Sequence, residues 1–196
     1  MQLSDLLLAA RVSVANPRLG FQMMRSLRLD SSTLVMALAA ITVIGVIPAE
    51  LMVWIMQQRG EVAIMDLGGG PFGLAMLQLG AGILSALAIY HVGRMFGGHG
   101  AFVDALLVVV WMQSILTLIQ VAQLVTLLIF PPFAQLLGLM AMVLVFWLSS
   151  GFIAEAHGFR SQLKTLFGMF ASGLLIVFAL AFLLVLLGFA PEMPNV

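Results

Sequence analysis

The sequence predicts an all-α membrane protein: a bundle of five transmembrane helices with an amphipathic helical segment at its N-terminus. Of the 196 residues, 63% are hydrophobic and only 8% are charged, whereas soluble domains carry about 25% charged residues. Such a chain lacks the polar groups needed to cover a surface that faces water, so lipid must be its main solvent. Five apolar stretches reach the ~20 residues that a helix needs to cross a bilayer.

Residues 1–31 predict two short amphipathic helices ahead of the first span. Ser4 or Asp5 can cap the first helix, where leucines recur at helical spacing. Asn16 followed by Pro17 is typical of the cap and first residue of a second helix. The start of the chain lacks the basic stretch and the unbroken apolar run of a signal peptide, so we expect this segment to be retained.

Four arginines follow one another along this segment, namely Arg11, Arg18, Arg25 and Arg28. A basic stripe beside an apolar one suits a helix that lies among lipid headgroups, where each basic residue contributes ~1 kcal/mol near an anionic surface. The alternative is that the arginines only fix the orientation of the chain in the bilayer, and the two interpretations are compatible.

The membrane domain is predicted over residues 32–189, with a short tail at 190–196 on the far side. Its five spans cover about 32–54, 72–91, 101–130, 133–154 and 165–189. Pro131 and Pro132 separate the third span from the fourth. Since proline removes a backbone donor and disfavours helix in the residue before it, these two spans should form a tight antiparallel hairpin.

The basic residues of the loops predict the orientation of the domain. Lys and Arg concentrate in short cytoplasmic loops. Five spans that start inside place seven of the eight basic residues on one side and leave only Arg59 on the other. The N-terminus is therefore predicted to be cytoplasmic and the C-terminus to lie on the far side of the membrane.

Polar residues form a stripe along the third span: Gln113, Thr117, Gln120 and Gln123. Their spacing places them on one helix face, and lipid offers such side chains no hydrogen bonds, so they should turn toward other helices or a cavity. We interpret the stripe as an interface between helices or with a partner, at about 0.6 kcal/mol per hydrogen bond. The alternative is a polar path through a small transporter or channel component.

A second polar set, which we term the polar rim, lies at the predicted cytoplasmic ends of the spans: His91, Arg94, His99, Asp104, Glu155, His157, Arg160 and Lys164. Its spacings match no metal-binding motif, and Glu155 and His157 should point to different faces of one helix. We interpret the rim as interfacial anchors and ion pairs, with no metal, no cofactor and no catalytic residue. A membrane-embedded enzyme would need His91, Asp104 and His157 to bind a metal together.

Other kinds of chemistry have no support in the sequence. The chain has no cysteine, which excludes disulfides and thiol catalysis, and its net charge of zero gives no indication of nucleic-acid binding. The glycines at 97, 98 and 100 lack the lysine of a phosphate-binding loop. Small residues four positions apart let helices approach closely; they occur at Gly82/Ala86, Ala81/Ser85 and Gly168/Ser172.

Several weak motifs occur in a fixed order along the chain. They are Asn16-Pro17 before the first span, His91-Val-Gly-Arg94 and Gly97-Gly-His-Gly100 after the second, Trp147 in the fourth, and His157-Gly-Phe-Arg160 before the last. In this order the chain resembles the bacterial branch of the Yip1-domain family. The resemblance covers most of the chain and is most telling over residues 85–170.

The resemblance implies a five-span domain with a cytoplasmic N-terminus and a periplasmic C-terminus in a bacterial inner membrane, or an endoplasmic reticulum or Golgi membrane if the chain is eukaryotic. Eukaryotic members of the family act in vesicle traffic, bind small GTPases of the Rab class and pair with related five-span proteins. Those members have a longer N-terminal region with an acidic-aromatic motif, which this chain lacks. We therefore do not carry small-GTPase binding over to it.

The sequence thus predicts a non-enzymatic multi-pass membrane protein whose partners are the lipid bilayer and other membrane proteins, a second copy of the chain included. It would act through association with these proteins or by organising the membrane. The alternative is a small transporter or channel component that uses the stripe of the third span.

Overall fold

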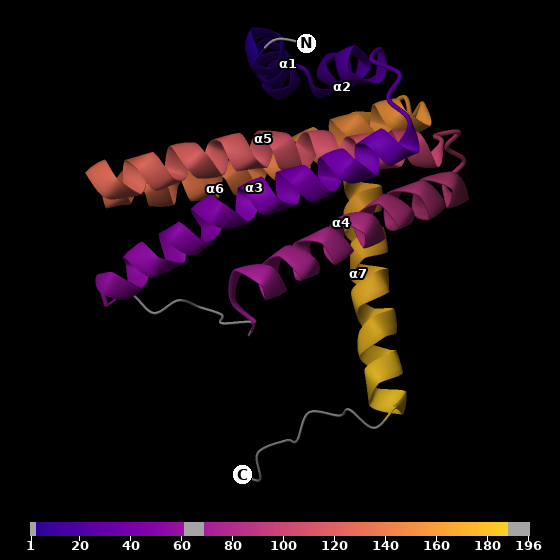
Figure 1. Ribbon diagram of the computed structural model, residues 1–196. Coiled ribbons are helices and arrows are strands. Elements are labelled where there is room, and N and C mark those ends of the chain that lie inside the picture. Colours follow the sequence, from indigo (N-terminus) through magenta and orange to yellow (C-terminus); the bar gives the residue numbers. More distant parts are fainter. Residues whose placement is uncertain (1–2, 61–68, 188–196) are drawn as a thin grey trace.

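The computed structural model describes residues 3–60 and 69–187 (Figure 1). The predicted tail at 190–196 lies outside these ranges. Over the described residues the chain forms helices joined by short turns and loops, with no strand. The helices are α1 (Leu3–Ala15), α2 (Pro17–Arg25), α3 (Ser31–Gln58), α4 (Gly70–Met95), α5 (Phe102–Ile129), α6 (Pro131–His157) and α7 (Gln162–Leu186).

Five of these helices, α3 to α7, are long and apolar enough to cross a membrane, which confirms the predicted all-α fold with five spans. The helices extend a few residues beyond most of the predicted limits. Only Phe130 separates α5 from α6, and α6 begins at Pro131. A proline in the first turn gives up an N–H that has no partner inside the helix, so the two prolines start α6 rather than delay it.

The core of the bundle lies around α5. In Figure 1, α3, α5 and α6 run side by side, with α4 next to them and α7 leaving the bundle at a steep angle. Every residue from Asp104 to Trp111 is buried, whereas among the described side chains of α7 only that of Thr165, in the first turn, is buried. The side chains that fill the centre come from α3, α5 and α6; the fully buried ones include Leu34, Leu38, Leu106, Val108, Leu148 and Phe152.

The two N-terminal helices pack against the bundle. As predicted, Asn16 caps α2: its side chain accepts a hydrogen bond from the backbone N–H of Leu19, and Pro17 is the first helical residue. Phe21 of α2 is fully buried, and its ring lies 5.9 Å from that of Phe152 on α6. The chain between residues 3 and 25 is therefore part of the folded unit.

Glycine permits the close crossing of α1 and α2. A Cβ atom at Gly20 would lie 2.5 Å from the Cα atom of Ser13, closer than real Cβ contacts come. No side chain can therefore occupy position 20 without separating the two helices.

Asp30 starts α3. Its side chain accepts a hydrogen bond from the backbone N–H of Ser32 at 3.2 Å and one from the hydroxyl of Thr33. The hydrogen bonds with the Ser32 and Thr33 side chains lower the pKa of Asp30 to about 2. The carboxylate therefore stays ionised as the cap of the first spanning helix.

Candidate functional site

The polar rim lies at one end of the bundle, where three chain segments meet. The end of α2 reaches α5 through Arg25 and Asp104. The loop between α4 and α5 reaches the end of α6, because the backbone N–H of His99 donates to the carbonyl of His157 at 3.2 Å. The sequence-predicted rim residues thus share one end of the molecule, but their contacts divide them into separate groups.

Asp104 is bound on both oxygens by Arg25. The guanidinium Nε lies 2.8 Å from Oδ1, and Nη2 donates to Oδ2 at 2.9 Å. The carboxylate also accepts the backbone N–H of Ala101 at 3.0 Å, at the start of α5. The Asp104 side chain is only 10% exposed, whereas that of Arg25 is 49% exposed. Both oxygens of the carboxylate are therefore engaged, in holding α2 to α5 and in capping α5.

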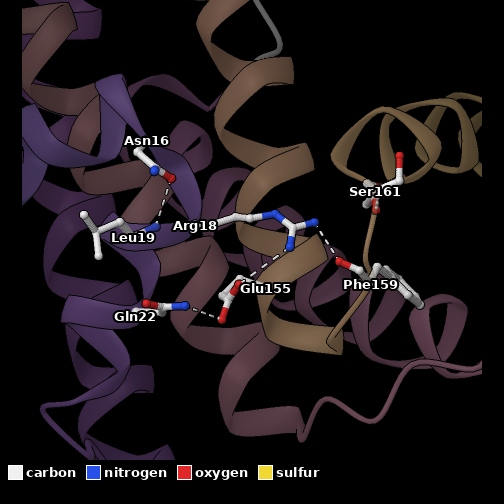
Figure 2. A network of polar contacts seen from close by, with 8 residues as sticks. Asn16, Arg18, Leu19, Gln22, Glu155, Phe159 and Ser161 are labelled. Atoms are coloured by element: carbon white, nitrogen blue, oxygen red, sulfur yellow. Dashed lines mark hydrogen bonds and ion pairs between the residues drawn. The ribbon is translucent and has the colours of Figure 1, made fainter.

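Glu155 of α6 receives a second group of contacts from α2, drawn in Figure 2. The side chain of Gln22 donates to its Oε1 at 2.8 Å, and the Arg18 guanidinium lies 3.9 Å from its Oε2. Arg18 also donates to the backbone carbonyl of Phe159 at 2.6 Å, in the loop between α6 and α7. These contacts join α2 to the loop that leads into the last spanning helix.

Two tryptophans extend this docking along the bundle. The indole N–H of Trp111 donates to the hydroxyl of Ser13 at 2.9 Å, and that of Trp147 donates to the carbonyl of Val14 at 3.0 Å. Trp111 follows Asp104 by two turns of α5, so α1 contacts the bundle about 10 Å from the rim end. The N-terminal segment thus contacts the bundle through α1 as well as through α2.

The sequence prediction did not anticipate this docking. It assigned the N-terminal arginines to lipid headgroups or to topology, yet Arg18 and Arg25 bind carboxylates of the bundle. Arg11 and Arg28 are exposed and form no ion pair within the part of the chain that the structure describes. The available signal was spacing: residues 18 and 25 are two turns apart on α2 and therefore share a face.

His157 is enclosed by three glycines. A Cβ atom at Gly93 would lie 2.3 Å from the ring, one at Gly98 would lie 2.6 Å from its Nδ1, and one at Gly100 would lie 2.9 Å from the same nitrogen. The backbone N–H of Gly100 donates to Nδ1 at 3.3 Å. On another side the ring stacks on Phe159, with centroids 5.5 Å apart. His157 therefore joins α4, the loop after it and α6.

The other rim residues do not gather around His157 and Asp104. His91 and His99 are exposed, and Arg94 donates to the hydroxyl of Tyr90 at 2.7 Å. Glu155 and His157 do face different neighbours, as their spacing predicted. In residues 3–60 and 69–187, no three His, Cys, Asp or Glu side chains are placed to hold a metal ion together.

The glutamine stripe of α5 contacts two neighbouring helices. Gln113 donates to the hydroxyl of Thr42 on α3 at 3.2 Å, and Gln123 donates to the carbonyl of Ala134 on α6 at 3.5 Å. Thr117 is buried, and a Cβ atom at Gly45 of α3 would lie 3.2 Å from its hydroxyl. Gln120 is half-buried. Three of the four stripe residues are thus placed at contacts between helices.

A groove of about 580 Å³ lies between α4 and α7, with α5 and α6 at its base. Arg160 and Lys164 stand at its rim end. We call it the α4–α7 groove. Residues along its walls include Ser85, Ala88, Ile89, Gly93, Val108, Met112, Ile153, Gly168, Met169, Ser172, Gly173 and Ile176. The sequence indicated Gly168 and Ser172 as a close-packing pair, but in this structure they line a hollow.

The long apolar helices and the docked N-terminal segment define a multi-pass helical membrane protein. The family model described as the Yip1 domain matches residues 12–183. The chain therefore belongs to the Yip1 family, as its order of motifs indicated. Comparison with curated proteins and with solved structures gave no match.

Proposed function

We propose that this Yip1-family protein has no enzymatic activity and acts in the bilayer by associating with other membrane proteins through α7. The observation that carries the proposal is the exposure of α7, where Thr165 in the first turn is the only buried residue among the described side chains. Its outward face carries large apolar side chains, of which Phe167 is 66% and Phe178 is 64% exposed. Spanning helices associate by close packing rather than by a hydrophobic force. The exposed face of α7 can pack against another protein without rearrangement of the bundle.

The contacts of the polar residues support a non-enzymatic role. Asp104 is occupied by Arg25, Glu155 by Arg18 and Gln22, and the His157 ring is enclosed by glycines. These groups hold segments together, and a catalytic group must reach a substrate. Transport along the glutamine stripe is the second candidate function. It is less well supported because Gln113 and Gln123 form hydrogen bonds with neighbouring helices.

The membrane and the orientation are part of the proposal. We place the chain in a bacterial inner membrane with the polar rim in the cytoplasm. The loop charges support this orientation, since seven of the eight basic residues then lie inside.

Site-specific crosslinking tests the association. A photoreactive phenylalanine analogue at Phe167 or Phe178 should crosslink to a second polypeptide in membranes, identified by mass spectrometry. The same analogue at Ile47 of α3, which is 65% exposed, is the matched control and should crosslink mainly to lipid. Equal protein crosslinking from α3 and α7, or a solitary monomer that turns over a substrate, would contradict the proposal.

A further inference from the structure

We propose that the α4–α7 groove binds one anionic phospholipid, with an acyl chain along the apolar walls and the phosphate between Arg160 and Lys164. This site lies on the face of α7 opposite to the one proposed for protein partners. It therefore goes beyond the association described above and does not depend on it.

The groove is hollow because the helices that border it present small side chains to each other. Gly168 and Gly173 of α7 line it, and a Cβ atom at either position would meet nothing within 4 Å. Ala88 and Gly93 line the opposite wall on α4. The volume of about 580 Å³ lies within the range of roughly 300–1,000 Å³ that is typical of ligand sites.

The mouth of the groove carries two cations that no residue in the described ranges neutralises. Arg160 and Lys164 are exposed, and neither side chain forms an ion pair or a hydrogen bond with any residue in the described ranges. Arg18 and Arg25, at the same end of the bundle, both have carboxylate partners. The first turn of α7 also lies at the mouth, where the helix dipole favours an anion.

Charge and polarity together select the occupant. A partner helix would fill the apolar part of the groove but would leave both cations without a counter-charge. An anionic phospholipid matches both parts at once, and basic pockets between spanning helices at the cytoplasmic surface suit the phosphate of such headgroups. The groove therefore fits an amphiphile with one negative end.

Native mass spectrometry of the full-length protein in mild detergent tests this. The protein is titrated with phosphatidylglycerol and with phosphatidylcholine of the same acyl chains. We expect phosphatidylglycerol to bind about 10-fold more tightly, and the double variant Arg160→Gln/Lys164→Gln to lose that preference. The double variant Arg11→Gln/Arg28→Gln removes two exposed arginines that do not line the groove. This variant should retain the preference for phosphatidylglycerol.

Substitutions in the wall distinguish a bound acyl chain from a headgroup held at the surface. Gly168→Leu fills the groove and should weaken binding of both lipids by about 10-fold or more; Gly173→Leu provides a second test if the first variant aggregates. Unchanged binding in a folded wall variant would overturn the proposal. The proposal would also be overturned if the Arg11→Gln/Arg28→Gln control lost the preference for phosphatidylglycerol to the same extent. Two further contrary results would be a protein helix, rather than a lipid, bound in the groove, and displacement of the lipid by inorganic phosphate alone.

Discussion

Gly93→Ala should destabilise the protein by about 1–3 kcal/mol, as expected for overpacking of a rigid site. The new methyl group would lie 2.3 Å from both Cε1 and Nε2 of His157. The ring cannot move away, because Gly98 and Gly100 enclose it and Phe159 stacks on it. The measurement is the midpoint of thermal unfolding in detergent.

Gly80→Ala is the matched control, because Gly80 lies on the same helix and a Cβ atom there would meet nothing within 4 Å. Alanine at this position should be neutral or stabilising by up to about 1 kcal/mol, since glycine is the weaker helix former. Adding His157→Ala to Gly93→Ala should restore part of the lost stability by removing the clash. Equal midpoints for the Gly93 and Gly80 variants would show that the ring is not held as described.

Arg25→Ala should release the N-terminal helices and cost about 2 kcal/mol of unfolding free energy. The substitution removes two charge-assisted hydrogen bonds and leaves the Asp104 carboxylate, which is 10% exposed, without its cation. The arginine is itself 49% exposed, so the cost should stay below the roughly 3–5 kcal/mol of breaking a fully buried pair. Faster amide hydrogen exchange in residues 3–25 would report the release.

Two further variants make the Arg25 prediction specific. Arg28→Ala removes an exposed arginine that has no ion pair within the described residues, and it should leave both stability and exchange unchanged. Asp104→Asn combined with Arg25→Ala should recover part of the loss, because the neutral amide can still accept the N–H of Ala101. If Arg25→Ala and Arg28→Ala behave alike, the ion pair does not hold α2 in place.

The elements of the fold could be predicted because their signals are local. A run of apolar residues long enough to span a bilayer identifies a helix without knowledge of its neighbours, and Asn16 followed by Pro17 marks a helix start by its own chemistry. The short connection at Phe130 follows in the same way from the adjacent prolines.

The contacts of the polar rim depend on docking between distant segments, which no local pattern records. The pairing of Arg25 with Asp104 requires α2 to lie against α5. The glycines near residue 98 could be excluded as a phosphate loop, but their role in enclosing His157 follows only from the approach of α6. The extent of burial was less visible, because lipid and a protein interior select the same apolar side chains. The glutamine stripe indicated that one face of α5 turns toward other helices, but the apolar residues of α5 and α7 did not show that α5 is central and α7 exposed.

The central claim is that α7 is a fifth span, which places its far end on the side opposite to the polar rim. The chain has no cysteine, so single-cysteine variants can be labelled without background by a maleimide that does not cross membranes. In intact spheroplasts, cysteines at Gln58 and Leu187 should be labelled, and those at Ser26 and His99 only after the membrane is opened. If the cysteine at position 187 were labelled only after the membrane is opened, like the one at position 99, α7 would not cross the bilayer. That result would contradict the account.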